Sequence, residues 1–373
     1  MKINIITCHD VYNYGASLQA FALMRYLMSI GHDVEIIDYK PDYLSHHYEF
    51  GYVNELNRFY PLCQKSELFK FLYGIRLLPI TFGTWQRIRP FNEFKKTCLR
   101  CTGRYKSFDE LKDNPPIADV YIAGSDQIWN CNLPNGKDPA FYLAFGHHVR
   151  KISYAASFAM DSMPDKYKDL VSSYLRNFDA ISVRETSGIK ILEELGYTGT
   201  AVIDPVYLLE KENWLHITES VKPYQGEYIL VYNLNRKNIE MIRKEAQRLS
   251  SLHKLKIVSI DSSFKCSYSD KNIHDAGPLE FVSLIANAKY VVTDSFHGMS
   301  FSIIMERPFC VMHSHSDSSR IKDLLSDLPL ESCMNNPIQD FTDLWPKAKK
   351  SLLDKSSSGK RFLLDNLSIE NND

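Results

Sequence analysis

Short apolar runs alternate with amphipathic segments along almost the whole chain, and this alternation limits the possible folds more than any other feature. Residues 2–7 (KINIIT) and 33–39 (DVEIIDY) have the length and the β-branched composition of buried strands. Between them, residues 15–30 have helical spacing and stop at Gly31. A strand, a helix and a second strand in this order form a βαβ unit, whose strands are parallel. The sequence therefore predicts an α/β protein.

The strand and helix pattern occurs twice, on either side of a proline-containing segment at residues 206–225, which we interpret as an interdomain linker. The chain has 373 residues, and a single hydrophobic core stops growing at about 250–300 residues. We therefore expect two facing Rossmann-like domains with a central cleft, the GT-B-like arrangement. The expected boundaries are residues 1–215 and 216–345, followed by a helix and a polar tail over residues 346–373.

One segment of the first domain departs from this pattern. Residues 43–115 are rich in aromatic and basic side chains and show no strand period, so they predict a helical insertion. Its stretch Phe69 to Phe94 could lie against a membrane surface, although a packing surface for helices is the alternative. Near the C-terminus, Ser356-Ser357-Ser358-Gly359 predicts that a helix over residues 339–353 has ended before the polar tail.

Composition excludes several classes of protein. The formal net charge is -1, and lysine and arginine are spread thinly, so we expect no nucleic-acid partner. No apolar run approaches the roughly 18 residues of a spanning helix, and residues 1–6 begin directly as a strand, so a cytoplasmic location without a signal peptide is expected. Cys98 and Cys101 form a CxxC pair without a second pair at metal spacing, and we therefore expect no metal site.

The turn Thr293-Asp294-Ser295-Phe296-His297-Gly298 is the strongest candidate for a site. It follows the apolar run YVVT and precedes a helix, and it gathers a hydroxyl, a carboxylate and an imidazole. In parallel sheets, ligands bind where a strand ends and a helix begins, because the free N–H groups of that helix favour anions. We predict that His297 is catalytic or binds a ligand, with Asp294 setting its tautomer; the alternative is a structural helix cap.

Two further positions predict an anion pocket. Arg184 stands at the end of an apolar strand, and burying a guanidinium requires an anionic partner. That partner is either a ligand or a carboxylate of this chain, Glu185 or Asp204. A second helix start at Ser318, Ser319 and Arg320 offers hydroxyls, free amides and a guanidinium, which suits a phosphate group.

Two other loops that follow strands have the composition of sugar-binding sites. In the first, Asn13 and Gln19 flank the start of a helix, and in the second, Ser125 and Asp126 precede Trp129. Carboxylate and amide groups bind sugar hydroxyls, while an aromatic ring covers the apolar face of a pyranose. A helix cap in the first loop and a core tryptophan in the second are the alternatives.

The segments NYGASLQA, GSDQIWN, ISYAASF, SVRE, VIDPV and TDSFHGMSFSI occur in this order, and together they resemble the polysaccharide pyruvyl transferase family. The resemblance runs from about residue 4 to residue 325 and skips residues 43–95. It implies a GT-B-like fold and transfer of the pyruvyl group of phosphoenolpyruvate to two hydroxyls of a sugar. The expected products are a cyclic ketal and phosphate, and the sugar is usually part of a bacterial surface polysaccharide or its lipid-linked precursor.

The resemblance also implies roles for particular residues. It makes His297 the general acid and Arg184 a donor-binding arginine. Some relatives carry an arginine where this chain has Ser295, and Arg320 can compensate for it. We expect the donor phosphoenolpyruvate to be held by Arg184, Ser295, His297, Gly298, Ser318, Ser319 and Arg320. We expect the acceptor side to be formed by Asn13, Tyr14, Gln19, Ser125, Asp126 and Trp129.

This chemistry requires no metal and no nucleotide, so we expect phosphoenolpyruvate as a co-substrate, a sugar acceptor that is lipid-linked, and no cofactor. Peripheral contact with the inner face of the membrane would follow from such an acceptor. Two other functions remain open. One is a GT-B glycosyltransferase that uses a nucleotide sugar, although no clear glutamate for a ribose clamp stands in the second domain. The other is a carbohydrate-binding protein without catalytic activity.

Overall fold

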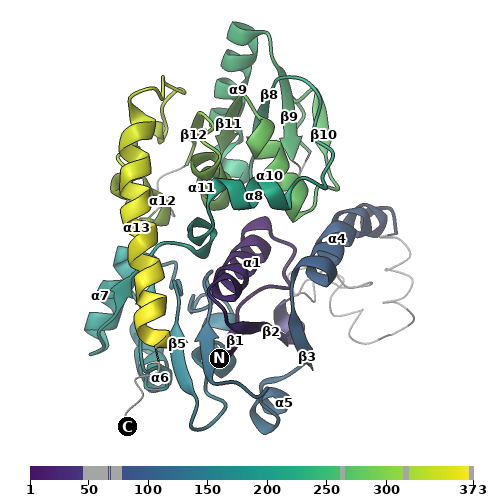
Figure 1. The fold of residues 1–373 in the computed structure, drawn as a ribbon. Coiled ribbons are helices and arrows are strands. Elements are labelled where there is room, and N and C mark those ends of the chain that lie inside the picture. Colours follow the sequence, from purple (N-terminus) through teal and green to yellow (C-terminus); the bar gives the residue numbers. More distant parts are fainter. Residues whose placement is uncertain (45–65, 67, 69–77, 261–264, 314–318, 369–373) are drawn as a thin grey trace.

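The computed structural model describes residues 1–44, 66, 68, 78–260, 265–313 and 319–368. Figure 1 shows these residues as two α/β bodies, one above the other. The first contains a parallel sheet of order β3-β2-β1-β4-β5. Its strands are β1 (Lys2–Ile6), β2 (Asp33–Tyr39), β3 (Cys101–Tyr105), β4 (Val120–Ala123) and β5 (Arg150–Ser153). Backbone hydrogen bonds from Ser153 to Ala180 and from Ala156 to Ser182 extend this sheet to β6 (Ser182–Val183) and β7 (Thr200–Ala201).

The second body repeats this topology with a parallel sheet of order β10-β9-β8-β11-β12. Its strands are β8 (Tyr228–Tyr232), β9 (Lys256–Ile260), β10 (Lys271–Ile273), β11 (Tyr290–Thr293) and β12 (Phe309–Val311). In both sheets the strand order reverses beside the first strand, as in Rossmann-like domains, and ligands bind in the crevice at that reversal. The prediction of an α/β protein with two such domains is confirmed.

Helices pack against both sheets. Those of the first body are α1 (Tyr14–Ser29), α4 (Leu78–Cys98), α5 (Phe108–Asp113), α6 (Asp165–Leu175) and α7 (Thr186–Glu194). Those that follow are α8 (Lys211–Ile217), α9 (Ile239–His253), α10 (Pro278–Asn287), α11 (Phe296–Ile304), α12 (Ser319–Asp327) and α13 (Leu344–Leu367). None of the helices in this described part of the chain combines the length and the apolarity that a membrane crossing needs.

The prediction of a purely helical insertion at residues 43–115 is wrong in part. Helix α4 lies in this range, but β3 does too and pairs with β2 at the edge of the sheet. No residue of β3 is fully buried, so the strand lacks the apolar alternation by which a sequence reveals a strand. The expected membrane-facing stretch, Phe69 to Phe94, lies partly outside the described residues.

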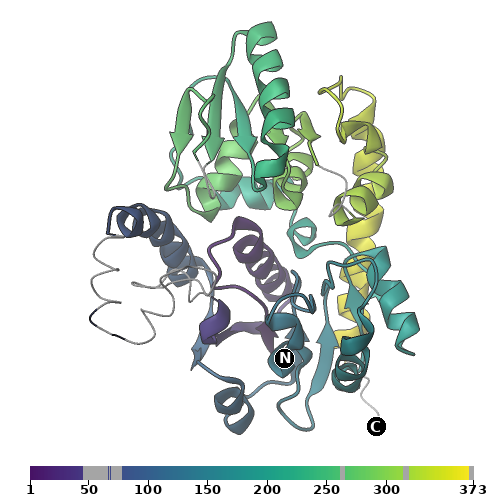
Figure 2. The ribbon, with the colours of Figure 1, turned by 180° about the vertical axis from the view of Figure 1, so that it is seen from behind.

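The expectation that the C-terminal helix ends before residue 356 is also wrong. Helix α13 runs without interruption through Ser356-Ser357-Ser358-Gly359, and both Figure 1 and Figure 2 show it running along the two bodies. The Ser356 hydroxyl donates to the Tyr207 carbonyl at 2.8 Å. A Cβ at Gly359 would lie 2.5 Å from the hydroxyl of Tyr154. The small residues are therefore the face that packs closely on the first domain, and tertiary contact overrides their weak helix propensity.

Aromatic side chains join the two domains. The Tyr14 ring of α1 stacks on Phe281 of α10 with centroids 4.5 Å apart, and its hydroxyl donates to the Ala276 carbonyl at 2.8 Å. Trp214 of α8 contacts Phe21 of α1 at 5.8 Å and Phe301 of α11 at 4.9 Å. We call these five rings the aromatic seam. They belong to one hydrophobic core that spans both domains, so the two domains pack as a unit.

Replacing Phe281 with alanine should lower the free energy of unfolding by about 3–5 kcal/mol, because a fully buried ring in the aromatic seam would leave a cavity. Urea denaturation measures this change. Leu252→Ala is the matched control, since that side chain is 63% exposed and its loss should cost less than about 0.5 kcal/mol. Equal costs for the two variants would contradict a seam that joins the domains.

Candidate active site

The carboxyl ends of the two sheets lead into loops that line one interdomain cavity of about 410 Å³. Loops from the first domain contribute Asn13, Asp126 and Gln127. The second domain contributes Asn235 and Ser295 from loops, and His297 and Arg320 from the first turns of α11 and α12. The first group follows β1 and β4, and the second follows β8, β11 and β12. The cavity therefore lies where the strand order of each sheet reverses, which is where such folds bind ligands.

The turn after β11 is held by its own hydroxyls. Thr293 donates its hydroxyl to the Tyr232 carbonyl at 2.6 Å and accepts the Ser295 N–H at 3.0 Å. Ser295 is the N-cap of α11 and accepts the Gly298 N–H at 3.2 Å. The amide of Gly298 is thus already engaged, which corrects its expected role in holding the donor. Ser295 itself lines the cavity.

His297 is buried at the first turn of α11, and it faces the other domain. Its Nε2 lies 3.6 Å from Oδ2 of Asp204, which follows β7. At this distance the two atoms are too far apart for a hydrogen bond, and they attract each other as an ion pair only when the imidazole is protonated. The expected partner Asp294 points elsewhere, because its carboxylate accepts hydrogen bonds from Asn233, Leu234, Asn235 and Asn238. Asp294 holds the loop after β8, and Asp204 is the carboxylate that faces the histidine.

Arg184 binds the same carboxylate. Its Nη1 donates to Asp204 Oδ2 at 2.6 Å, so the internal salt bridge, one of the two alternatives for this arginine, is present. Burial alone would raise the pKa of Asp204, but His297 and Arg184 hold it well below its usual range. Burial alone would lower the pKa of Arg184, and the carboxylates of Asp204 and Glu185 raise it instead. Both groups are therefore charged in the folded protein.

Several buried polar atoms of this cluster have no hydrogen-bond partner among the described residues. Besides Glu185 Oε2, which lies 4.0 Å from Arg184 Nε, they include three nitrogen atoms, Arg184 Nε, Arg184 Nη2 and His297 Nε2. A buried polar group without a partner is costly, so such atoms mark places where a water molecule, an ion or a ligand can bind. All three surround Asp204, at the boundary between the domains.

Arg320 adds a second guanidinium from the other domain. The Cζ atoms of Arg184 and Arg320 lie 4.9 and 5.9 Å from the centroid of the Phe296 ring. Burial, and after it the charge of Arg184, lowers the pKa of Arg320 to about 10. An anion between the two would relieve their repulsion. Of the other predicted anion-binding residues, Ser318 lies outside the described residues, and so does the side chain of Ser319.

The structure places the predicted acceptor residues in two groups, one that lines the cavity and one that lies inside the protein. Asn13 and Asp126 line the cavity. Asn13 also caps α1 by accepting the Ala16 N–H at 3.2 Å. Asp126 has a positive φ of 76°, an unusual conformation for a residue other than glycine, and it occurs directly beyond β4. Both remain candidates for contact with an acceptor.

The four other predicted acceptor residues are inside the protein, which corrects the expectation that a sugar contacts them. Tyr14 belongs to the aromatic seam. Gln19 donates to Thr7 Oγ1 at 2.8 Å, and Ser125 donates to Asp204 at 3.5 Å. Trp129 is fully buried, stacks on Tyr142 and donates Nε1 to the Phe141 carbonyl at 3.0 Å. At these positions, the polar groups that follow a strand therefore form hydrogen bonds within the protein and stabilise its loops.

Asp204 is the residue that sequence reasoning undervalued. The sequence indicated Asp204 only as a possible partner of Arg184. In the structure, it is the shared counterion of Arg184 and His297. Its Oδ1 also accepts the Val206 N–H at 3.1 Å, which fixes the start of the 3-10 helix Pro205–Leu208. An acidic residue between an apolar run and a proline, as in VIDPV, is the signal that could have indicated it.

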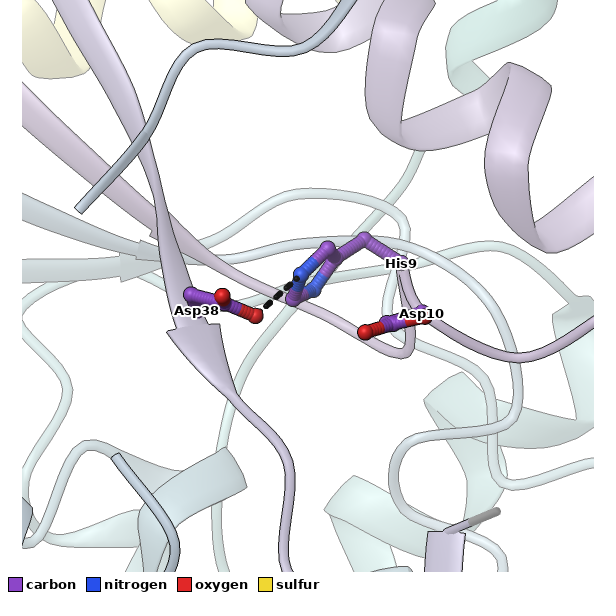
Figure 3. Close-up of side chains that lie close together, drawn as sticks. All are labelled: His9, Asp10 and Asp38. Carbon is purple, nitrogen blue, oxygen red and sulfur yellow. Dashed lines mark hydrogen bonds and ion pairs between the residues drawn. The ribbon is translucent and has the colours of Figure 1, made fainter. Parts of the chain in front are cut away.

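A separate cluster has the residue types of a metal site. Figure 3 shows the His9 ring facing Asp38, with Asp10 close by. However, Lys95 Nζ lies 2.8 Å from Asp10 and 2.7 Å from Asp38, and Lys40 and Arg104 contact the same carboxylates. A metal ion would have to displace Lys95, so we interpret the cluster as an ion-pair network that anchors α4 to the sheet. Cys101 is no better a ligand, because burial raises the pKa of its thiol to about 12.

Two facing Rossmann-like domains with a ligand cavity between them define a GT-B-like protein. A sequence model of the polysaccharide pyruvyl transferase family matches residues 13–316, and the chain belongs to that family. The chain is therefore a pyruvyltransferase of polysaccharide biosynthesis by family. No curated protein sequence matches it.

Among solved structures, a putative UDP-N-acetylglucosamine 2-epimerase from Listeria monocytogenes shares this fold. Its TM-score is 0.50 at 10% identity, and the match covers 97% of this chain and 90% of the other. A UDP-GlcNAc 2-epimerase from Methanocaldococcus jannaschii has a TM-score of 0.49 at 13% identity, with coverage of 98% and 99%. A heptosyltransferase II from E. coli has a TM-score of 0.39 at 11% identity, with coverage of 97% and 100%.

Replacing Asp204 with asparagine should destabilise the protein by about 3–5 kcal/mol at pH 7, because Arg184 would be left buried without its counterion. The folded pKa of Asp204 is lowered, so its contribution is complete above the unfolded value of about 3.9 and is lost as the pH falls below it. Urea denaturation of both proteins at pH 7 and pH 3 should show the difference shrinking in acid.

Asp327→Asn is the control for this experiment. The Asp327 carboxylate pairs with Lys355 at 2.7 Å, but it is 44% exposed, so its loss should cost at most about 1 kcal/mol. A difference between wild type and Asp204→Asn that stays constant down to pH 3 would contradict the shared-counterion assignment.

Proposed function

We propose that this protein transfers the pyruvyl group of phosphoenolpyruvate to two hydroxyls of one sugar and releases phosphate. The observation that supports this most strongly is the set of buried nitrogen atoms of Arg184 and His297 that have no hydrogen-bond partner around Asp204. Phosphoenolpyruvate carries two anionic groups, a carboxylate and a phosphate. Arg184 from the first domain and Arg320 from the second offer two guanidinium groups in the same region.

The proposed reaction begins with a proton transfer. His297 gives a proton to C3 of phosphoenolpyruvate, which becomes a methyl group, and C2 becomes oxocarbenium-like. A sugar hydroxyl attacks C2 and loses its proton. Phosphate then leaves from C2, and the second hydroxyl closes the ring and loses its own proton. Of the two hydroxyl protons, one restores His297 and the other leaves with the phosphate, so atoms and charges balance.

The residues of the candidate site suit these steps. The Asp204 carboxylate stabilises the protonated imidazole before the transfer, because it is charged and 3.6 Å from Nε2. The cationic groups of Arg184 and Arg320 favour departure of phosphate. In the cavity that His297 and Arg320 also line, Asn13 and Asp126 offer an amide and a carboxylate to sugar hydroxyls.

The acceptor is proposed to be a lipid-linked precursor of a bacterial surface polysaccharide, such as an exopolysaccharide or a capsule. This finer assignment rests on what the family resemblance implies. We propose that the reaction takes place in the cytoplasm, with the protein in peripheral contact with the membrane that holds the acceptor, without a metal ion or a nucleotide.

His297→Gln should lower kcat by about 10²- to 10⁴-fold, since it removes the proton donor, while the affinity for phosphoenolpyruvate changes only a few-fold. Arg184→Ala should lose both catalytic activity and phosphoenolpyruvate binding, because the donor anion and Asp204 lose their partner. Phosphate release with a panel of lipid-linked or aryl galactose, mannose and N-acetylhexosamine acceptors measures kcat, and calorimetry measures binding.

His216→Gln is the control, because this side chain is 81% exposed and lies outside the cavity. Uridine and guanosine nucleotide sugars belong in the same binding series. If they bind more tightly than phosphoenolpyruvate, the protein is a glycosyltransferase and the proposal fails. If phosphate release is absent with every acceptor and His297→Gln leaves ligand binding and cellular polysaccharide unchanged, a carbohydrate-binding protein is the better description.

A further inference from the structure

Gly15 occupies a position where a glycine has no local reason to be. It is the second residue of α1, and it does not have the positive φ that favours glycine. Alanine is the best helix former and glycine is among the poorest. The rest of the helix is well built, with Asn13 as its N-cap and a continuous row of buried residues. The reason for the glycine must therefore lie in what contacts it.

The His297 ring occupies the space that a side chain at Gly15 would need. A Cβ at this position would lie 1.9 Å from Nδ1, 2.3 Å from Cε1 and 2.4 Å from Cγ of His297. Real Cβ atoms do not approach other atoms so closely, so any larger residue would force the ring to move. The imidazole belongs to the second domain and Gly15 to the first, so this contact crosses the domain boundary.

Two contacts with the first domain therefore set the orientation of the ring. Gly15 packs against the Nδ1 side, and Asp204 faces Nε2 at 3.6 Å. Phe296 lies edge-on to the ring with centroids 5.1 Å apart. With Nδ1 against α1, Nε2 is the nitrogen that is directed toward Arg184 and Asp204, where the proposed donor binds.

The position of Gly15 is in turn fixed by the aromatic seam. The preceding residue, Tyr14, stacks on Phe281 and donates to the Ala276 carbonyl, and both partners belong to the second domain. The packing that joins the domains therefore also holds the start of α1 in contact with the imidazole. If the domains separated, His297 would lose the Gly15 contact and the Asp204 contact together.

We infer that Gly15 is a positioning residue for His297, which makes the orientation of the proton donor depend on the packing of the two domains. The absence of a side chain at Gly15 allows α1 to seat the ring with Nε2 toward the donor site. The catalytic part of this inference rests on the proposed function, whereas the contact itself does not.

The first test is Gly15→Ala, assayed by phosphate release. The added methyl group should rotate the ring away from the donor and lower kcat by about 10- to 100-fold, while KM for phosphoenolpyruvate changes less than about 3-fold. Gly103→Ala in β3 is the matched control, because a Cβ there meets nothing within 4 Å, and it should keep the wild-type kcat. A Gly15→Ala protein with unchanged kcat overturns the inference, and so does one in which only KM changes.

The second test is a double-mutant cycle on thermal stability, which requires no activity. Gly15→Ala should lower Tm in the wild-type background, where the methyl group meets the ring. In a His297→Ala background the ring is gone, and the same substitution should leave Tm unchanged or raise it. An equal loss in both backgrounds overturns the contact.

The two tests separate failure of this inference from failure of the proposed function. If no acceptor supports phosphate release from the wild-type protein, the proposed function fails, and the cycle still decides whether Gly15 seats His297. If the cycle shows no coupling while the wild-type protein is active, the inference about Gly15 fails alone.

Discussion

The carboxylate of Asp204 is the interaction on which the arrangement of this protein depends. It is buried where the two domains meet, binds Arg184 of its own domain at 2.6 Å and faces His297 of the other at 3.6 Å. A buried guanidinium and a buried imidazole are tolerated there because one charged carboxylate serves both. Nitrogen atoms of Arg184 and His297 remain without a hydrogen-bond partner beside this carboxylate, and the proposed donor would bind them.

The packing that joins the two domains also contacts the candidate site. The aromatic seam holds α1 against α10 and α11, and the start of α1 contacts the imidazole. Helix α13 adds a second connection, because its small residues lie on Tyr154 and Tyr207 of the first domain and its Trp345 ring lies beside Phe309 of the second. Because the residues of the candidate site come from both domains, such packing decides their relative position as well as stability.

Residue types indicated which segments come together better than they indicated individual contacts. The motif around His297 and the arginine after β6 were identified from sequence, and both lie in one cluster at the domain boundary. Asp294 and Trp129 looked equally suited to ligands, but Asp294 is saturated by the loop after β8 and Trp129 is in the core. A loop needs polar groups for its own backbone, and sequence alone does not distinguish those from groups that face a cavity.

The sequence by itself determined the α/β class, the alternation of strands and helices in two domains, and the ends of the strands where a site would form. These features follow from periodicity and from the strand-to-helix turns, which are local properties. Only the tertiary structure decided that β3 joins the sheet, that α13 continues through three serines and a glycine, and that Gly15 and Asp204 enclose His297. Each of these depends on a partner far away in the chain, and no local pattern carries that information.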